Sequence, residues 1–172
     1  MNRAWIGLGG NVGDPLHRMA AALRRLDAHP EISVEIVSPV YRTPPWGKTD
    51  QPDFLNACAG LRTEIEPAAL LDLCLEVERA LHRERRERWG PRTIDIDLLD
   101  YDGRRVATDR LVLPHPHMTQ RAFVLVPLAE IAPKLTIDGE TVQVWRERIA
   151  TGGIELSEAG GDWWRDEARA ED

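Results

Sequence analysis

Cysteine is scarce in this sequence of 172 residues: Cys58 and Cys74 are the only two, and they do not form a C-x-x-C pair. The scarcity excludes a disulfide framework. Each cysteine lies in an apolar segment, where a thiol ordinarily acts as a small packing group. We therefore expect both side chains to be buried, and we assign them no chemical role.

Long hydrophobic runs are also missing, since no apolar stretch reaches the length of a transmembrane helix. Residues 1–14 lead directly into a strand and a turn, without the apolar core and the small-residue cleavage site of a secretory signal. We therefore expect a cytoplasmic protein that has no membrane partner.

A surplus of positive charge is absent as well, because the formal net charge is -7 at pH 7. Proteins that mainly bind nucleic acid hold the phosphate backbone with excess lysine and arginine, so nucleic acid is not an expected partner. Six arginines nevertheless lie between positions 79 and 92. This local basic zone can hold a small polyanion.

The arginine-rich segment has a simpler interpretation as the solvated surface of a helix, with Glu84 and Arg88 as an ordinary pair four residues apart. That interpretation accounts poorly for Arg92, because Gly90 and Pro91 separate it from any continuing helix. Arg92 instead stands just before a run of alternating apolar and acidic residues.

The hydrophobic content of 42% and the charged content of 30% are ordinary for a single globular domain of this length. Hydrophobic periodicity and turn residues predict strands and helices, with no internal repeat. Their order (strand, helix, strand, strand, helix, strand) matches the split β-α-β plan of a ferredoxin-like domain. We therefore expect an α+β fold, an αβ sandwich in which helices pack on a mostly antiparallel sheet.

Short local signals place the individual elements. Strands are expected at residues 4–10, 32–41, 52–64, around 94–98 and within 110–118, and helices after the N-cap Asp14, from Pro67 to about Leu81, and after the N-cap Thr119 with a break or kink at Pro127. Residues 134–150 suggest a last strand and helix. We place one domain at residues 1–154. We expect residues 155–172 to form an acidic, flexible tail, in which Trp163 and Trp164 can dock locally.

The segment GLGGNVGD, residues 7–14, invites comparison with phosphate-binding loops. It lacks the G-K-[S/T] of a P-loop, and Val12 stands where the dinucleotide pattern G-x-G-x-x-G needs its third glycine. We therefore interpret it as a tight turn between a strand and a helix.

The segment RWGPRTIDIDLL, residues 88–99, places two acids inside a run that reads as a buried strand. Side chains alternate along a strand, so Asp95 and Asp97 share the face opposite to the intervening Ile96. Neighbouring carboxylates repel, so a positive group is expected near them. The spacing alone leaves three interpretations open: a metal site, a solvent-facing strand edge, or a salt bridge to Arg88 or Arg92.

The combination of acids and arginines favours the metal site. Magnesium takes a few oxygen ligands from protein and the rest from water and substrate phosphates, and two ions about 3.5 to 4 Å apart can share a carboxylate pair. Flanking arginines would neutralise the phosphate charge that the metals do not reach. The pattern therefore indicates phosphoryl or nucleotidyl transfer from a nucleoside triphosphate.

Four segments in this order, YRTPPWG, QPDFLNA, RWGPRTIDIDLL and LPHPHMTQRAFVLVPL, resemble the 6-hydroxymethyl-7,8-dihydropterin pyrophosphokinase family of folate biosynthesis. The resemblance extends from about residue 4 to about residue 149. It implies a diphosphate transferase that moves the β,γ-pyrophosphate of ATP to the pterin hydroxymethyl group, and we expect the protein to be a monomer. The implied products are AMP and the pterin diphosphate, and the implied cofactor is a pair of Mg²⁺ ions.

The resemblance also implies roles for individual residues. The metal ligands would be Asp95 and Asp97, which form the catalytic group together with Arg83 and Arg92. The implied ATP contacts are Glu78, Arg85, Arg88, Trp89, Leu98, His115 and Arg121. The implied pterin contacts are Thr43, Pro44, Trp46, Phe54, Asn56 and Phe123. In this group Phe54 and Phe123 would stack on the two faces of the ring, and the Asn56 amide would hydrogen-bond its edge.

Two other functions compete with this interpretation. A nucleotidyltransferase would have its glycine motif a short step before the acids, whereas Gly10 and Asp95 are far apart in this sequence. An RNA-binding ferredoxin-like module would need basic and aromatic residues on an open sheet, and the paired aspartates on a strand oppose that.

Overall fold

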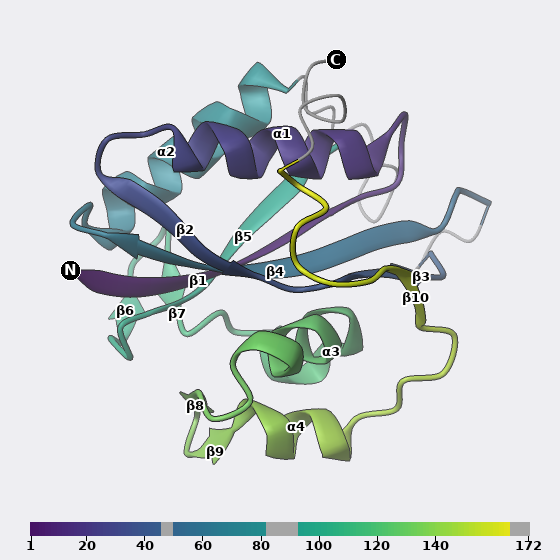
Figure 1. Cartoon of the computed structure of the whole chain (residues 1–172). Helices are drawn as coiled ribbons and strands as arrows, with labels where there is room; N and C mark the ends of the chain where they lie inside the picture. Colours follow the sequence, from purple (N-terminus) through teal and green to yellow (C-terminus); the bar gives the residue numbers. More distant parts are fainter. Residues whose placement is uncertain (46–49, 82–92, 166–172) are drawn as a thin grey trace.

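The computed structural model describes residues 1–45, 50–81 and 93–165. The elements appear in Figure 1 in this order: β1 (Asn2–Gly10), α1 (Pro15–Asp27), β2 (Ile32–Val37), β3 (Val40–Thr43), β4 (Phe54–Thr63), α2 (Pro67–Ala80), β5 (Asp95–Tyr101), β6 (Val106–Ala107), β7 (Val112–Leu113), a 3-10 helix (Met118–Gln120), α3 (Ala122–Ile131), β8 (Thr136–Ile137), β9 (Glu140–Thr141), α4 (Val142–Arg148) and β10 (Glu155–Glu158). None of the helices in this part of the chain has the length and hydrophobicity needed to cross a membrane.

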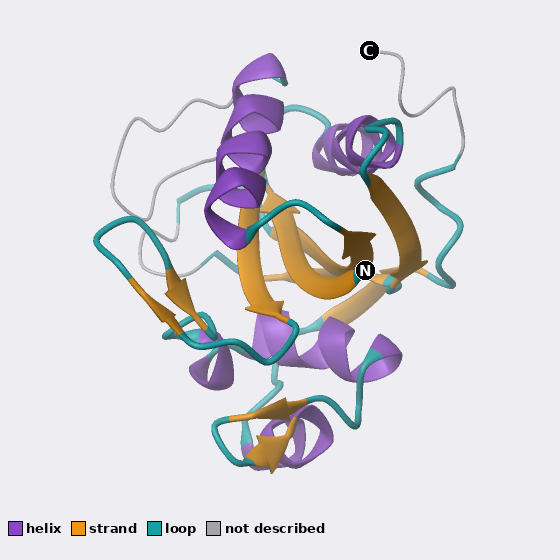
Figure 2. Cartoon of the chain, turned by 90° about the vertical axis from the view of Figure 1, so that its left-hand side faces the viewer, coloured by secondary structure: helices purple, strands orange, loops and turns teal. Residues whose placement is uncertain are grey.

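The main sheet has six strands in the order β10-β3-β4-β1-β5, and β2 also pairs with β4. Each pairing between these strands is antiparallel. Helices α1 and α2 cover one face of the sheet, while α3 packs on the other with α4 outside it (Figures 1 and 2). The expected α+β sandwich with a mostly antiparallel sheet is confirmed.

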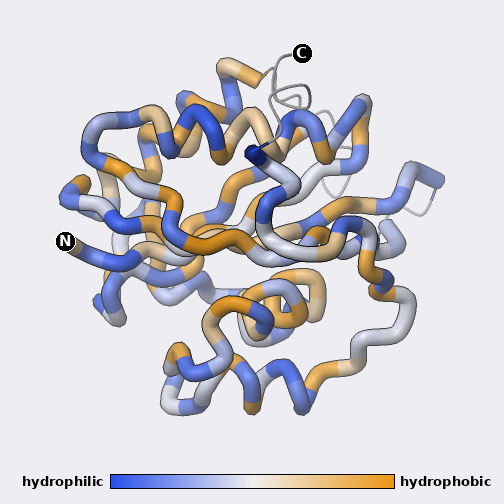
Figure 3. The backbone as a smooth tube through the Cα atoms, viewed as in Figure 1, coloured by the Kyte–Doolittle hydropathy of each residue, from blue (hydrophilic) through white to orange (hydrophobic). Residues whose placement is uncertain are grey.

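Two hydrophobic cores form on the two faces of the sheet. The first includes Ile6 and Leu8 of β1 and lies under α1 and α2, while the second includes Trp5 and Cys58 and lies under α3. Neighbouring residues of β1 therefore point into different cores, as the alternation of a strand requires. The hydrophobic parts of the chain gather in the central strands and in α3, between the outer helices (Figure 3).

Helix α1 begins where the sequence predicts. The Asp14 side chain accepts a hydrogen bond from the backbone N–H of His17 at 3.0 Å, and Pro15 occupies the first turn. A proline there loses no intrahelical bond, because the first N–H groups of a helix have no partner within it. The predicted cap at Asp14 is confirmed.

The predicted single strand over residues 32–41 is wrong, because the structure divides it into β2 and β3. The Ser38 hydroxyl accepts a hydrogen bond from the Cys58 N–H, and the Ser38 N–H donates to the Cys58 carbonyl, both at 2.9 Å. Pro39 has no N–H to continue the ladder. Periodicity does not reveal this break, since hydrophobic residues continue on both sides of it.

The predicted N-cap at Thr119 is also wrong. Thr119 lies inside the 3-10 helix, and α3 begins after Arg121, which has an extended backbone and no side-chain cap bond. The N–H of Arg121 bonds the Met118 carbonyl, so a tight turn precedes the helix. The helix has ten residues with Pro127 inside it, which agrees with the predicted short helix.

The strand predicted within residues 110–118 is reduced to Val112–Leu113, because Pro114 and Pro116 cannot donate backbone hydrogen bonds.

The structure differs from the expected flexible tail at residues 155–165. Strand β10 pairs with β3, and the Trp163 and Trp164 side chains are buried. Trp163 Nε1 donates a hydrogen bond to the Ser38 carbonyl at 2.9 Å, so the expected docking of this tryptophan is found. The division of the chain at residue 154 stays a prediction.

Candidate active site

Strand β5 presents its two aspartates on one face. Asp95 and Asp97 are partly exposed, while Ile94, Ile96 and Leu98 are buried. The alternation predicted from the sequence is thus confirmed. Asp97 lies opposite Gly7 of β1, and Gly7 lies opposite Cys58, which belongs to the core under α3. Asp95 and Asp97 therefore lie on the side of the sheet that α3 covers.

Glu78 of α2 holds the backbone of β5 between the two aspartates. Its Oε2 atom accepts a hydrogen bond from the Ile96 N–H at 2.7 Å, and the residue is only 3% exposed. Within residues 1–45, 50–81 and 93–165, β5 is the last strand on its side of the sheet, so this N–H has no further described strand to pair with. Glu78 therefore fixes the strand that carries the acids.

The antiparallel register brings the paired acids into line with residues of the neighbouring strands. Asp95 lies opposite Gly9 of β1, and Gly9 lies opposite Asn56 of β4, which lies opposite Tyr41 of β3. Residues opposite one another in a ladder point to the same face. Asn56 and Asp95 therefore face the same side, and two strand spacings put their Cα atoms roughly 10 Å apart.

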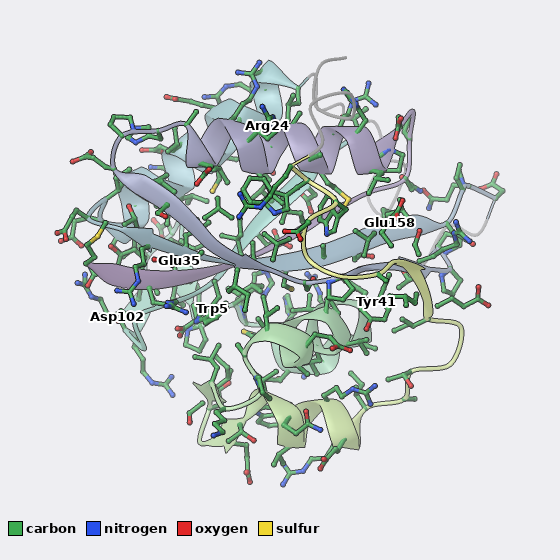
Figure 4. All side chains as sticks on the ribbon, in the orientation of Figure 1. Trp5, Arg24, Glu35, Tyr41, Asp102 and Glu158 are labelled. Carbon is green, nitrogen blue, oxygen red and sulfur yellow. The ribbon has the colours of Figure 1, made fainter. Side chains whose placement is uncertain are left out.

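Tyr41 marks the far end of this row. Its hydroxyl donates a hydrogen bond to Glu130 of α3 at 2.8 Å, and burial together with this carboxylate raises the pKa of Tyr41 to about 12. Figure 4 shows Tyr41 and Trp5 on the α3 side of the sheet. Tyr41 thus joins β3 to α3 beside Asn56.

Asn56 and Thr43 form a buried polar pair. The Thr43 hydroxyl donates a hydrogen bond to Asn56 Oδ1 at 3.2 Å, and both residues are less than 10% exposed. The bond fixes which end of the amide faces Thr43. Phe54 lies opposite Thr43 in the register and is partly exposed. Pro44 follows Thr43 directly, so the four described members of the predicted pterin group that come from β3, β4 and the residue after β3 lie together at this end of the sheet.

The segment at the start of α3 reaches the acids from the helix layer. Arg121 Nη1 lies 3.9 Å from Asp97 Oδ2, and its guanidinium carbon lies 5.6 Å from the centroid of the Phe123 ring. The Arg121 side chain is 25% exposed and that of Asp97 is 35% exposed. The Arg121 guanidinium therefore lies close both to Asp97 and to the Phe123 ring.

His115 approaches from the loop after β7. The backbone N–H of His115 donates to the Leu99 carbonyl at 2.8 Å, and the ring Nδ1 of His115 accepts from the backbone N–H of His117 at 3.2 Å. With Nδ1 as an acceptor, the ring proton of neutral His115 lies on Nε2. Burial, followed by the charge of Arg121, lowers the pKa of His115 to about 4. The imidazole is therefore neutral near pH 7.

Two predicted ATP contacts have side chains that point elsewhere. Leu98 is 3% exposed and belongs to the core under α1 and α2, and Glu78 is bonded to β5 as described above. Six further predicted site residues lie outside the described part of the chain: Trp46, Arg83, Arg85, Arg88, Trp89 and Arg92.

The two cysteines are buried and free, as the sequence predicts. Burial raises the pKa of Cys74 to about 12 and raises that of Cys58 as well, so neither thiol is ionised near neutral pH. Both residues act in packing.

Sequence reasoning missed the part that the segment at residues 7–14 plays in the site. Gly9 separates Asn56 from Asp95, and the Asn11 side chain donates to Gln51 Oε1 and to the Pro52 carbonyl, both at 2.9 Å. The interpretation as a turn considers only neighbours in sequence. The position of Gly9 beside Asn56 follows from the register between β1 and β4, and that register is known only once the fold is known.

The carboxylates of β5 are suitable ligands for a hard divalent cation. Among the described residues, no group of three or more His, Cys, Asp or Glu side chains converges to form an all-protein metal cage. Magnesium does not require such a cage, since it is ordinarily held by one or two carboxylates together with water and phosphate oxygens. Asp95 and Asp97 fit that requirement.

Comparison with a protein-family model gives a match over residues 5–133 to the family described as 7,8-dihydro-6-hydroxymethylpterin-pyrophosphokinase (HPPK). The match includes the whole of β1 to α3 apart from the first residues of β1.

Two full-length relatives are similar to this chain. A 2-amino-4-hydroxy-6-hydroxymethyldihydropteridine pyrophosphokinase of Methylorubrum extorquens is 54% identical over 158 residues, which cover 92% of this chain and 100% of that protein. The protein of the same name from Bacillus subtilis is 40% identical over 165 residues, covering 92% of this chain and 99% of the relative.

Among solved structures, wild-type Plasmodium falciparum HPPK-DHPS with pteroate is similar, with a TM-score of 0.70 and 14% sequence identity. The similarity covers 86% of this chain and 44% of that longer chain. At this identity the comparison shows a shared fold.

Proposed function

The chain belongs to the 7,8-dihydro-6-hydroxymethylpterin-pyrophosphokinase family, and from this premise we propose which of its residues perform the transfer. The enzyme transfers pyrophosphate from ATP to hydroxymethyldihydropterin in folate biosynthesis, so it is a diphosphate transferase. Removal of a pyrophosphate group from ATP leaves AMP. The proposal concerns the site, the metal and the parts played by single residues.

The observation that carries the proposal is the shared face of Asp95, Asp97 and Asn56, with Arg121 beside Asp97. We place ATP at the acidic end and the pterin at the amide end. Asp95 and Asp97 would hold two Mg²⁺ ions, which compensate phosphate charge when bound. Gly9 lies between the two ends, so substrate atoms can pass over bare backbone there.

The pterin end is suited to a flat ring with a polar edge. The Asn56 amide can match donors and acceptors of the ring, and the Thr43 hydroxyl keeps that amide in one orientation. Phe54 and Phe123 are partly exposed aromatics from β4 and α3 that can stack on the two faces of the ring. Pro44 lies at this end as well, and Trp46 is the remaining predicted member of the pterin group.

The ATP end supplies charge and a neutral donor. The long distance from Arg121 to Asp97 leaves guanidinium donors for phosphate oxygens, and the neutral His115 can donate from Nε2. We propose that Glu78 and Leu98 act on ATP only through the position of β5, since their side chains are buried. Arg85, Arg88 and Trp89 remain predicted contacts to ATP.

The chemistry that we propose needs no covalent intermediate. Asp95, Asp97 and Arg121 would hold the triphosphate so that the β-phosphorus stands in line with the pterin hydroxyl. Arg83 and Arg92 are predicted to absorb the charge that develops during transfer. We also propose a monomer that works in the cytoplasm with small-molecule substrates alone.

Product analysis tests the reaction together with its metal dependence. The protein is incubated with ATP and 6-hydroxymethyl-7,8-dihydropterin, with and without Mg²⁺, and the nucleotide products are separated. We expect AMP and pterin diphosphate only when Mg²⁺ is present. Release of inorganic pyrophosphate would indicate nucleotidyl transfer, and AMP formation in a metal chelator would contradict the magnesium site.

A further inference from the structure

Gly9 lies where any side chain would collide with the proposed pterin-binding amide. A Cβ atom added at Gly9 would overlap Nδ2 of Asn56, which lies opposite it in β4. The same Cβ would lie 3.3 Å from the Leu55 carbonyl oxygen, a tight contact. The Asn56 amide thus occupies the space that a side chain at position 9 would fill.

The Asn56 amide has little freedom to move aside. Asn56 is 9% exposed, and its Oδ1 atom accepts the hydrogen bond from Thr43. A methyl group at position 9 would push Nδ2 away and turn the amide relative to Thr43. The orientation of the amide therefore depends on the missing Cβ at Gly9.

We propose that Gly9 is a specificity-determining residue of the pterin site, because its lack of a side chain lets Asn56 hold the amide orientation that recognises the pterin edge. Gly9 acts through Asn56 and is a positioning residue. The inference deepens the proposed function and rests on the assignment of Asn56 to the pterin edge. The pterin affinity should therefore depend on the size of the residue at position 9.

Gly7 offers a matched control on the same strand and the same face. It lies opposite Cys58 and Asp97, and among the residues that the structure describes a Cβ atom there would meet only the Leu99 side chain, with the nearest atom at 3.7 Å. That is an ordinary van der Waals contact. Gly7→Ala and Gly9→Ala thus make the same chemical change in β1, and only the second collides with Asn56.

The first experiment measures steady-state kinetics, ATP affinity and the melting temperature of Gly9→Ala and Gly7→Ala. We expect Gly9→Ala to raise the pterin KM about tenfold or more through the misplaced amide, with the Kd of ATP unchanged. Gly7→Ala should leave both values within about twofold. An unchanged pterin KM in Gly9→Ala would overturn the proposal, and so would an equal rise in Gly7→Ala.

The second experiment combines Gly9→Ala with Asn56→Ala. We expect Asn56→Ala to raise the pterin KM and the added Gly9→Ala to raise it no further, because the colliding amide is gone. Independent effects that multiply in the double variant would overturn the proposal. If Asn56→Ala alone leaves the pterin KM unchanged, the assignment of Asn56 fails. If Asn56→Ala raises the pterin KM but Gly9→Ala leaves it unchanged, the assignment of Asn56 stands and the inference about Gly9 fails.

Stability decides the case in which Gly9→Ala folds poorly. Recovery of the melting temperature in the double variant, to the value of Asn56→Ala, would support the collision with Asn56. An equal loss with and without Asn56 would show that the Leu55 carbonyl, rather than the amide, requires glycine, and would overturn the proposal.

Discussion

Phe123 is the residue of the helix layer that we assign to the pterin. Its ring lies beneath the Arg121 guanidinium, which also approaches Asp97. We expect Phe123→Ala to weaken pterin binding by roughly 1 kcal/mol or more, because stacking and buried apolar area are lost. Titration of the pterin followed by fluorescence measures this change. The Kd of ATP should stay the same, and an unchanged pterin affinity would remove Phe123 from the pocket.

Asp100 is a buried acid of β5, the strand that carries Asp95 and Asp97. The proposed chemistry does not use Asp100. Burial raises the pKa of Asp100, and the N–H of Gly103, which donates to its carboxylate at 3.3 Å, opposes that rise only in part. A raised pKa in the folded state means that this carboxyl stabilises the fold at low pH. The contribution is fully present below the unfolded pKa of about 3.9 and is lost as the pH rises through the folded pKa.

Asp100→Asn should therefore be more stable than the wild type near pH 7, because the neutral amide avoids burial of a charge. The difference in the free energy of unfolding should shrink as the pH falls through the raised folded-state pKa of Asp100, and it should level off below the ordinary pKa of a carboxyl. Urea unfolding at several pH values between 3 and 8 measures it. A variant that is less stable at pH 7, or a difference independent of pH, would contradict the assignment.

Residue-scale prediction succeeded where the physical cause was local. The shared face of Asp95 and Asp97 follows from the alternation of side chains along one strand, and it needed no knowledge of the fold. The dependence of Asn56 on Gly9 could not be predicted, because it arises from the register between two strands that are distant in sequence. The buried acceptor role of Glu78 was missed for the same reason.

At the scale of elements, the C-terminal strand β10 extends the sheet beyond β3. Trp163 is 6% exposed, and its Nε1 donates to Ser38 at the break between β2 and β3. We expect Trp163→Ala to lower the free energy of unfolding by about 3–5 kcal/mol, as for other large aromatic side chains removed from a core. Chemical denaturation measures the loss.

Leu156→Thr is the matched control for the C-terminal element. Leu156 lies in β10 but is 57% exposed, so this substitution should change stability by no more than about 0.5 kcal/mol. Equal stability of Trp163→Ala and the wild type would show that residues 155–165 add little to the fold.

The starts of α1 and α2 were predicted well, whereas the start of α3 and several strand boundaries were not. Asp14 and Pro15 define the start of α1 through their own backbone chemistry. The break at Ser38 and the pairing of β10 depend on partners in other strands, Cys58 and Tyr41 among them. An acidic, glycine-spaced segment such as residues 155–165 has no strong strand pattern, so its place in the sheet comes from tertiary contacts.

At the scale of the whole molecule, the two faces of the sheet differ in what they carry. One face carries the core under α1 and α2, and the other carries a core under α3 with the proposed site at its end. The order of elements predicted this sandwich, because antiparallel β-α-β-β-α-β units have few compatible arrangements. The order of elements could not predict that Asn56 of β4 and Asp95 of β5 lie on either side of Gly9.

The central claim is that the acids on the α3 face of β5 support pyrophosphate transfer, and one comparison tests it most directly. AMP formation from ATP and 6-hydroxymethyl-7,8-dihydropterin is measured at saturating Mg²⁺ for the wild type, Asp97→Asn and Asp100→Asn, with melting temperatures as a check on folding. The two variants make the same chemical change on the same strand. We expect Asp97→Asn to lower kcat by about 10²–10³-fold or more while it stays folded, and Asp100→Asn to stay within about twofold of the wild type. Near-normal turnover of folded Asp97→Asn would contradict the claim.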